Sequence, residues 1–229
     1  MVAKQASLEV DSQTKNETRE RILTVAEDLF SKSGIEAVSL RTLTTAAKVN
    51  VAAAHYHFGS KYDIVEEIFR RREEPIASRR RELLSQCREA PSLPPLLEQI
   101  ISAYILPALE AGRDPASVSY LRLRARLAYD DAYLRRREYY RTFEDSSAAF
   151  IKALQKELPH LSREEMYWRF HFLLGTMTYT MANPGRIQML SDGLCDPGDV
   201  EQALNRMVPF LAAGFRAPMP PAKKPARKS

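Results

Sequence analysis

The chain has 229 residues, of which 45% are hydrophobic and 28% are charged, and its formal net charge is +5. This length leaves room for a small domain and a larger one, and the modest charge is by itself weak evidence for nucleic-acid binding. Cys87 and Cys195 lie far apart, which argues against a disulfide framework, and no apolar run approaches the ~18 residues of a membrane span. Residues 1–13 lack the hydrophobic region of a signal peptide, so we expect a cytoplasmic protein.

Residues 1–15 are polar and aperiodic, and we expect them to form a disordered arm. A helix is predicted over residues 16–33, where apolar side chains recur at helical spacing, and Gly34 is predicted to end it. The apolar stripe is expected to pack against residues 40–49 in a small three-helix core. The stripe consists of Ile22, Val25, Ala26, Leu29 and Phe30.

Residues 39–61, SLRTLTTAAKVNVAAAHYHFGSK, have the pattern of a helix-turn-helix. Ser39 is a favourable N-cap for a helix over residues 40–48, and Asn50, after a short break, can cap a second helix over residues 51–57. In such a pair, the second helix enters the major groove of DNA.

The charges in this stretch favour the same interpretation. No Asp or Glu lies between Glu36 and Asp63, and a surface that binds phosphate needs this absence of acid as much as it needs bases. Three alanines at positions 52–54 keep the second helix slim enough to approach a groove. The alternative is an ordinary solvated pair of short helices. The basic residues and histidines here are Arg41, Lys48, His55, His57 and Lys61.

Residues 17–68 closely resemble the N-terminal domain of TetR/AcrR-type transcriptional regulators, and the segment YHFGSK is a specific marker. The resemblance implies a DNA-binding domain and assigns contacts to the matching positions. His55 departs from the Tyr or Asn that is more usual there, so the family's base preference does not carry over. Ser39 and Arg41 match positions that hold the DNA backbone, Asn50, Val51, Ala52 and His55 match groove-facing positions, and Tyr56, His57 and Lys61 match phosphate-contacting positions.

A long helix is predicted after Ser60, its N-cap, with Asp63 completing a capping box. Lys61 lies in the first turn, where unsatisfied backbone amides favour an anion. The arginine triplets at 70–72 and 79–81 are interpreted as a solvated face rather than a second nucleic-acid site. We expect this helix to act as a lever between the two domains.

Helical periodicity continues through the rest of the chain. Residues 120–129 alternate with period two, which could indicate a strand, but no other segment offers a partner strand, so a helix is predicted. The helix over 163–182 is apolar on nearly every face and must be covered on all sides, which points to a second subunit. The helices predicted after Pro95 span about 96–111, 116–129, 132–158, 163–182 and 197–215.

The sequence therefore predicts an all-α fold. A three-helix helix-turn-helix DNA-binding domain over residues 16–60 is followed by a larger helical ligand-binding and dimerisation domain over residues 61–216. Residues 217–229, rich in Pro and Lys, are expected to form a disordered basic tail.

The C-terminal region carries a second resemblance. Residues 157–182 and 195–218 resemble the matching segments of PsrA-like TetR regulators, which respond to fatty acids. This resemblance implies a homodimer built on the last two long helices and a body that accepts an acyl-type effector, such as a fatty acid or an acyl-CoA. Sensor domains in the family differ widely in ligand.

Arg122, Arg124 and Arg126 interrupt an otherwise apolar predicted helix, and at least one of them is expected to point inward. A buried guanidinium needs an anionic partner, which the head of an effector could supply. The alternative is a partner within the protein, and the candidates are Glu110, Glu144 and Glu157.

The aromatic helix over 163–182 has two open interpretations. Its rings could line an effector pocket, or they could belong to a packed core and a dimer seam, with His171 as a hydrogen-bonded core histidine. The candidate ligand-binding residues are Tyr104, Arg122, Arg126, Phe143, Trp168, His171 and Phe172.

The leading hypothesis is a dimeric, ligand-responsive transcriptional regulator. It would be a repressor that binds a palindromic DNA operator and is released by an apolar effector with an anionic head. The alternatives are a ligand-independent DNA-binding regulator and an activator. An enzyme is disfavoured, because the sequence contains no Gly-rich phosphate loop, nucleophile elbow or zinc-ligand spacing. We expect no cofactor, no metal and no membrane partner.

Overall fold

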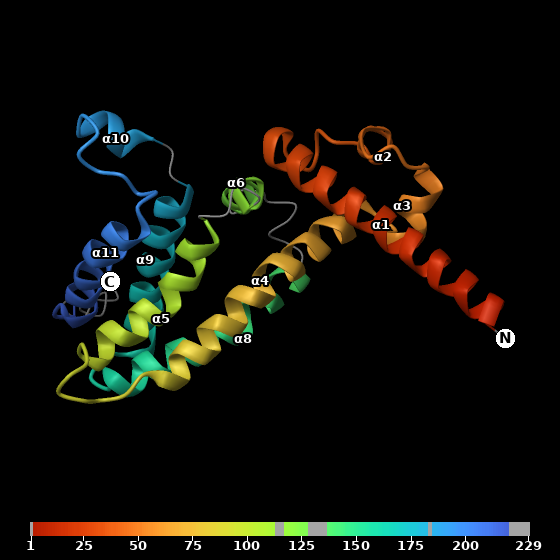
Figure 1. Cartoon of the computed structure of the whole chain (residues 1–229). Helices are drawn as coiled ribbons and strands as arrows, with labels where there is room; N and C mark the ends of the chain where they lie inside the picture. Colours follow the sequence, from red (N-terminus) through yellow and green to blue (C-terminus); the bar gives the residue numbers. More distant parts are fainter. Residues whose placement is uncertain (1, 113–116, 128–136, 183–184, 220–229) are drawn as a thin grey trace, which may run out of the picture. The chain divides into compact units, whose positions relative to one another are not determined.

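The computed structural model describes the backbone of residues 2–112, 117–127, 137–182 and 185–219, and the side chains of these residues except 2–12, 125 and 137–145. Every regular element in these ranges is an α-helix, so the predicted all-α fold class is confirmed (Figure 1). None of the helices in the described ranges is long and apolar enough to cross a membrane.

The chain divides into two compact units. Unit 1 contains residues 1–79 and 110–145, and unit 2 contains residues 80–109 and 146–229. This division differs from the predicted boundary after residue 60, because the first part of the long fourth helix and the described residues of segment 110–145 group with the N-terminal helices. The predicted domain limits stay a prediction.

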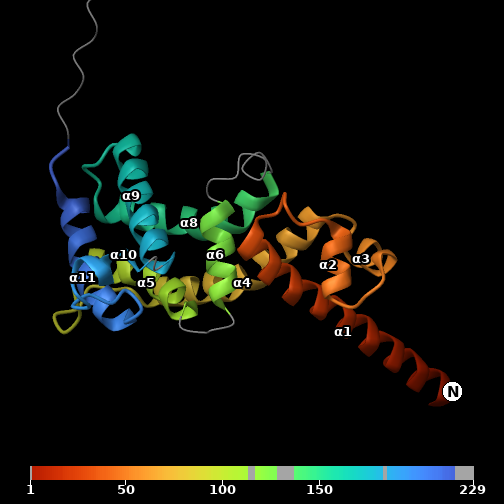
Figure 2. The ribbon, with the colours of Figure 1, turned by 90° about the horizontal axis from the view of Figure 1, so that it is seen from above.

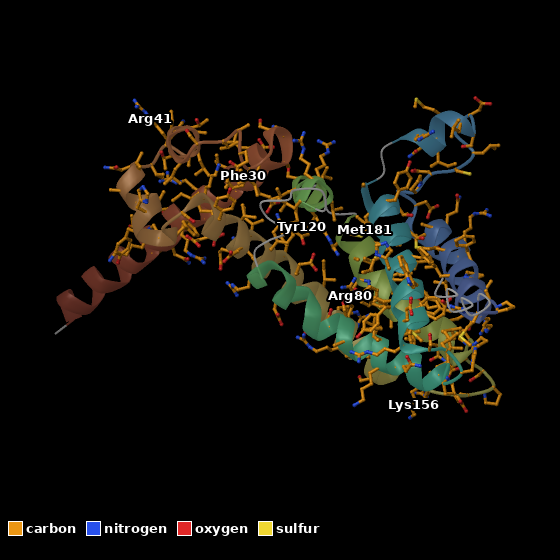
Figure 3. All side chains as sticks on the ribbon, turned by 180° about the vertical axis from the view of Figure 1, so that it is seen from behind. Phe30, Arg41, Arg80, Tyr120, Lys156 and Met181 are labelled. Atoms are coloured by element: carbon orange, nitrogen blue, oxygen red, sulfur yellow. The ribbon has the colours of Figure 1, made fainter. Side chains whose placement is uncertain are left out.

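Unit 1 is built around a helix-turn-helix. It comprises α1 (Val2–Ser33), α2 (Leu40–Ala46), α3 (Val51–Phe58), the start of α4 (Lys61–Gln86), α6 (Val118–Leu127) and the start of α8 (Arg137–Glu157). The predicted stripe of α1 forms the centre, since Ile22, Ala26 and Phe30 are fully buried together with Leu43 of α2 (Figure 3). α6 crosses α1 and packs against it (Figure 2).

The predicted start of the first helix at residue 16 is wrong, because α1 begins at Val2. The expected arm over residues 1–15 is therefore helical from its second residue. The physical reason is local: residues 2–15 contain no Pro or Gly, and several of them are good helix formers, such as Ala3, Gln5 and Leu8. Low hydrophobicity alone did not justify the prediction of disorder.

Unit 2 packs the end of α4 with the C-terminal helices. It comprises α5 (Leu96–Ala111) as far as residue 109, the second half of α8, α9 (Arg163–Ala182), α10 (Arg186–Leu190) and α11 (Val200–Arg216). Tyr104 is buried at its centre, where its ring meets Phe150 and Phe170 at centroid distances of 5.0 and 5.1 Å. The short helix α10 was not predicted. The tail residues 220–229 lie outside the described residues.

Candidate functional site

Two side chains cap the helices of the helix-turn-helix. The Ser39 hydroxyl accepts a hydrogen bond from the Thr42 backbone amide at 3.0 Å, which begins α2. The Asn50 side-chain carbonyl accepts from the Ala52 amide at 2.9 Å, which begins α3. Both predicted caps are present, and each satisfies one of the amides that a helix start leaves without a partner.

The turn between α2 and α3 depends on a lysine in a left-handed conformation. Lys48 has a φ of 53°, and the flanking amides close a Schellman motif. In this motif the Val49 amide donates to the Thr44 carbonyl at 3.0 Å, and the Lys48 amide donates to the Thr45 carbonyl at 3.1 Å. The turn thereby ends α2 sharply and sets the direction of α3.

The outward face of α3 combines small side chains with the rings of His55 and Tyr56. Ala54 faces the core with 1% exposure, whereas Val51, Ala52, His55 and Tyr56 are exposed. Such a face can approach the floor of a groove closely while it offers hydrogen-bonding groups to base edges. Val51, Ala52 and His55 are positions predicted to face the groove, together with the exposed cap Asn50, whereas Tyr56 was predicted to contact phosphate.

His55 has a defined tautomer when it is neutral. Its Nδ1 lies 2.8 Å from the Gly59 carbonyl oxygen, and a carbonyl can only accept, so Nδ1 carries the proton. The remaining ring nitrogen, Nε2, is then an acceptor. On an exposed side chain of α3, this acceptor would pair with a donor such as the amino group of adenine or cytosine.

Lys61 is partly engaged within the protein. Its ammonium group donates to the Ile35 carbonyl at 2.9 Å and lies 3.4 Å from a Glu36 carboxylate oxygen. Hydrogen bonds from the Tyr62 hydroxyl and from Lys61 lower the pKa of Glu36, so this carboxylate stays charged beside Lys61. The sequence pattern did not show that Glu36 would offset part of the positive charge predicted to bind phosphate.

The remaining predicted DNA contacts lie on the same part of unit 1. Ser39 and Arg41 are exposed, and Arg41 projects from α2 away from the core (Figure 3). His57 is partly buried, with its ring 5.2 Å from that of Tyr56. The predicted capping box is present too, since the Ser60 amide donates to the Asp63 carboxylate at 2.8 Å and the Asp63 amide lies 3.3 Å from the Ser60 hydroxyl.

The arginine triplet at 70–72 bonds to carboxylates of the protein. Arg72 forms two hydrogen bonds to Glu27 at 2.9 and 3.0 Å, and Arg71 pairs with Glu20. These pairs join α4 to α1. Arg71 and Arg72 therefore hold two helices together, which differs from the solvated face that was predicted, and a second nucleic-acid site was not predicted.

The predicted ligand-binding residues lie in different surroundings, although the rings of Trp168, His171 and Phe172 lie together, with centroids 6.0 Å apart. Trp168, His171 and Phe172 are exposed on α9, so His171 is not the core histidine that we considered. Tyr104 is buried in the packed aromatic core of unit 2. The side chain of Phe143 lies outside the described residues. Helical geometry explains the correction, because an aromatic stripe shows which residues share a face but not whether that face turns inward.

The prediction for the arginines of α6 needs a similar correction. Arg122 and Arg126 are exposed, and Arg126 donates to the Lys32 carbonyl at the end of α1 at 3.0 Å. Arg124 is the buried member and pairs with Glu73 of α4 at 2.9 Å. The partner lies on a helix that sequence reasoning did not consider, because only the packing of α4 on α6 brings the two together.

A second buried arginine was missed. Arg80, interpreted above as part of a solvated face, is 1% exposed, lies 3.8 Å over the ring of Tyr104 and donates to the Tyr104 carbonyl at 2.8 Å (Figure 3). A signal existed in the sequence, since Ile68 and Ile76 are buried on α4 and Arg80 continues that series by one further turn.

Unit 2 contains a groove with a volume of about 660 Å³ between the end of α4, α5 and α11. This volume lies within the usual range of small-molecule sites, roughly 300–1,000 Å³. None of the predicted ligand-binding residues lines it. Its apolar lining includes Leu83, Leu93, Leu106, Leu204, Val208 and Pro209.

The polar groups of this groove are mostly neutral or paired. Burial raises the pKa of the Cys87 thiol, and Glu98 is held by Arg216 through two bonds of 2.6 and 2.7 Å. The Gln99 side chain holds the segment between α4 and α5 against α5. It accepts a hydrogen bond from the Arg88 backbone amide and donates one to the Arg88 carbonyl. Within the described part of the chain we find no ion pair for the Arg88 side chain, which is exposed at the groove.

A helix-turn-helix with a slim second helix, joined to a second helical unit of similar size, is typical of a DNA-binding transcriptional regulator. Two family models agree. "Bacterial regulatory proteins, tetR family" matches residues 22–68, and "Tetracyclin repressor-like, C-terminal domain" matches residues 102–214. The chain belongs to the TetR family of transcriptional regulators, and it is not an enzyme.

Individual relatives are distant. A segment of 57 residues is 42% identical to the HTH-type transcriptional regulator AcrR of Shigella flexneri, and it covers 25% of this chain and 26% of that protein. The chain therefore matches about a quarter of the length of that curated relative.

Solved structures share the fold. The TetR family regulator PfmR of Thermus thermophilus has a TM-score of 0.57 at 16% identity, with 88% of this chain and 97% of that chain covered. The regulator FadR of Bacillus subtilis, in complex with stearoyl-CoA, has a TM-score of 0.54 at 15% identity, with 85% and 98% covered. The ketosteroid regulator KstR2 of Mycobacterium tuberculosis has a TM-score of 0.57 at 17% identity, with 86% and 93% covered.

Proposed function

We propose that this chain is a cytoplasmic, ligand-responsive repressor that binds a palindromic operator as a homodimer and leaves it when a small-molecule effector binds. The observation that carries the proposal is the outward face of α3, which combines small side chains, the cap Asn50 and the acceptor of His55. A dimer places two such helices about one turn of DNA apart, or a small multiple of it, which is why the operator should be palindromic.

The proposed DNA contacts divide into two kinds. Ser39, Arg41, Tyr56, His57 and Lys61 would bind phosphates and fix the position of the protein, and their contribution would fall as salt rises. The remaining residues would recognise bases, and His55 would select an adenine or a cytosine. The base-facing set is Asn50, Val51, Ala52 and His55.

Exposed aromatic side chains in unit 2 support the homodimer. Trp168, Phe172 and Tyr179 of α9 and Phe210 of α11 are each more than half exposed. Large rings on the surface of one chain are expected to be covered in the functional assembly. We call these four residues the α9–α11 seam and assign it to a two-fold interface between copies of this chain.

The groove of unit 2 favours ligand response over a ligand-independent regulator. Its apolar lining suits a hydrocarbon chain, and the exposed guanidinium of Arg88 suits an anionic head, as in a fatty acid or an acyl-CoA. The FadR structure, which resembles this fold, holds stearoyl-CoA. Arg88 thereby takes the role that sequence reasoning gave to Arg122 and Arg126.

α4 offers the connection between effector and operator. One continuous helix runs from Lys61, beside the proposed DNA contacts, to Gln86, which lines the groove with Leu83. A ligand could bind more tightly when the C-terminal end of α4 takes one of two positions. Such a ligand would favour that position and shift the DNA-binding helices with it. Operator affinity would then change by an amount set by the ligand's difference in affinity for the two states.

The test of DNA binding compares three alanine variants by fluorescence anisotropy over a range of salt concentrations. Arg41→Ala should weaken binding to all sequences and reduce the salt slope by about 0.9, the value for one phosphate. Lys61→Ala should do the same to a smaller degree, because its ammonium already bonds to Ile35 and Glu36. His55→Ala should lose about 1–3 kcal/mol of discrimination at one base pair.

Lys152→Ala, which removes an exposed charge from α8, is the matched control and should leave binding unchanged. The proposed docking of α2 and α3 on DNA would be refuted if none of the three variants, Arg41→Ala, Lys61→Ala and His55→Ala, altered operator affinity.

The test of the effector is a titration of the protein–operator complex with acyl-CoAs, free fatty acids and neutral aromatics. Release by the anionic acyl compounds, weakened in Arg88→Ala and normal in Arg122→Ala and Arg126→Ala, would support the groove. Release by neutral compounds alone would refute the anionic effector, and no release by any small molecule would favour the ligand-independent regulator.

A further inference from the structure

Residues 186–194, which we call the α10 arm, expose an unusual amount of apolar surface. The arm consists of α10 and the turn after it, and it connects α9 to α11 within unit 2 (Figure 1). Met189 is 76% exposed, Leu190 72% and Leu194 83%, and Ile187 is also exposed. Isolated exposed hydrophobic residues are ordinary on a protein surface, but four within eight residues form a patch that needs an explanation.

Hydrogen bonds of Ser191 and Gly193 hold the turn of the arm in place. The Ser191 hydroxyl donates to the Ile187 carbonyl at 2.7 Å and accepts from the Cys195 amide at 3.1 Å. The Gly193 amide donates to the Gln188 carbonyl at 2.8 Å. These hydrogen bonds brace the turn of the arm, while its four apolar side chains stay exposed.

The α9–α11 seam alone is small for a stable dimer. An aromatic side chain buries about 150–250 Å² when it is covered, so four that are between half and three-quarters exposed offer roughly 450 Å². A standard interface takes about 800 Å² from each partner. The four apolar side chains of the arm would add roughly 250 Å² more. This area is the usual free energy of burying a Leu or Met side chain divided by the free energy gained per Å² of buried apolar surface.

We infer that the α10 arm is a dimerisation element that packs onto a second copy of this chain and extends the α9–α11 seam. The inference rests on the proposed homodimer and deepens it. The arm by itself is too small for an independent protein partner, because even weak specific interfaces bury several hundred Å² from each side. A membrane surface would select a basic amphipathic element, and the arm has one Arg and one Asp.

The first measurement is a photo-cross-link. The photoreactive residue benzoylphenylalanine replaces Leu194, and the purified full-length protein is irradiated in solution. A covalent product of twice the chain mass, with the cross-linked peptide identified by mass spectrometry as part of the second copy, is the expected result. The same replacement at Leu93, which lines the groove outside the seam and the arm, should give no dimer product.

The second measurement is the dimer dissociation constant by sedimentation. The triple variant Met189→Gln, Leu190→Gln, Leu194→Gln should raise it at least about 100-fold, because covering each of these side chains is worth roughly a tenfold change in affinity. The replaced side chains are exposed within one chain, so the helix content by circular dichroism should stay unchanged. Leu93→Gln should leave the dissociation constant at the wild-type value.

The outcomes distinguish the two proposals. A dimer that forms as tightly in the triple variant as in the wild type, without a cross-link at position 194, overturns the role of the arm and leaves the dimeric regulator intact. A wild-type chain that stays monomeric overturns both. An arm that binds anionic lipid vesicles, lost in the triple variant while the dimer is unaffected, overturns the inference in favour of a membrane surface.

Discussion

The exposed face of α3 in unit 1 and the exposed faces of α9 and α11 in unit 2 differ in the atoms that they leave uncovered. The first exposes small side chains and groups that can form hydrogen bonds, on Asn50, His55 and Tyr56. The second exposes the rings of Trp168, Phe172 and Phe210. Exposure alone does not identify a partner. The chemistry of the exposed atoms does, since the first face suits a charged, wet nucleic acid and the second suits another apolar surface.

The strongest test of this difference removes two rings from the α9–α11 seam. Trp168→Ala combined with Phe172→Ala should raise the dimer dissociation constant about 1,000-fold, because each central aromatic contributes about 2 kcal/mol or more. Sedimentation of the wild-type dimer at low and high salt tests the chemical difference between the two faces. Apolar association should persist at high salt, where operator binding is lost. A dimer that weakens with salt as steeply as operator binding would contradict the comparison.

A buried ion pair in the interior of unit 1 gives the next prediction. In unit 1 the buried carboxylate of Glu73 accepts from Tyr120 and pairs with Arg124. Glu73→Gln leaves the guanidinium of Arg124 without its charge partner, so the free energy of unfolding should fall by about 3 kcal/mol. Urea denaturation measures this loss. Glu110→Gln, on an exposed glutamate that sequence reasoning offered as a partner, should change stability by less than about 0.5 kcal/mol.

A smaller effect is expected at Lys48, where two variants separate the contribution of backbone strain to stability from the contribution of charge to operator affinity. Lys48 has a positive φ of 53°, which only Gly adopts without cost. Lys48→Gly should therefore be about 1 kcal/mol more stable than Lys48→Ala, although both variants lose the same positive charge and so should have equal operator affinity. Thermal unfolding and anisotropy measure the two quantities separately. Equal stability of the two variants would show that the turn carries no strain.

The smallest expected effect concerns acid sensitivity in unit 2. The hydrogen bonds from Arg216 lower the pKa of Glu98 below its ordinary value of 4.5. The stabilisation is therefore present above that value and is lost as the pH falls through the lower pKa of the folded state. Glu98→Gln should cost about 0.5 kcal/mol at pH 7, and this cost should shrink as the pH is lowered below 4.5, by urea denaturation. A cost that does not change with pH would mean that the pair contributes through packing alone.

The helix-turn-helix was largely predictable from the sequence. The caps Ser39 and Asn50, the capping box at Ser60 and the stripe of α1 depend on residues a few positions apart, so local patterns contain the required information. The all-α class and most helix ranges followed for the same reason. The start of α1 did not, because low hydrophobicity is a poor guide where no residue breaks a helix.

The tertiary structure alone decided which side chains turn inward and what they meet. Period and spacing placed three arginines on α6 and an aromatic stripe on α9, but packing buried Arg124 against Glu73 and left Trp168 exposed. Packing also buried Arg80 beside Tyr104. These choices depend on residues dozens of positions apart. A helix pattern shows which side chains share a face, and only the contacts between helices determine whether that face meets the core or solvent.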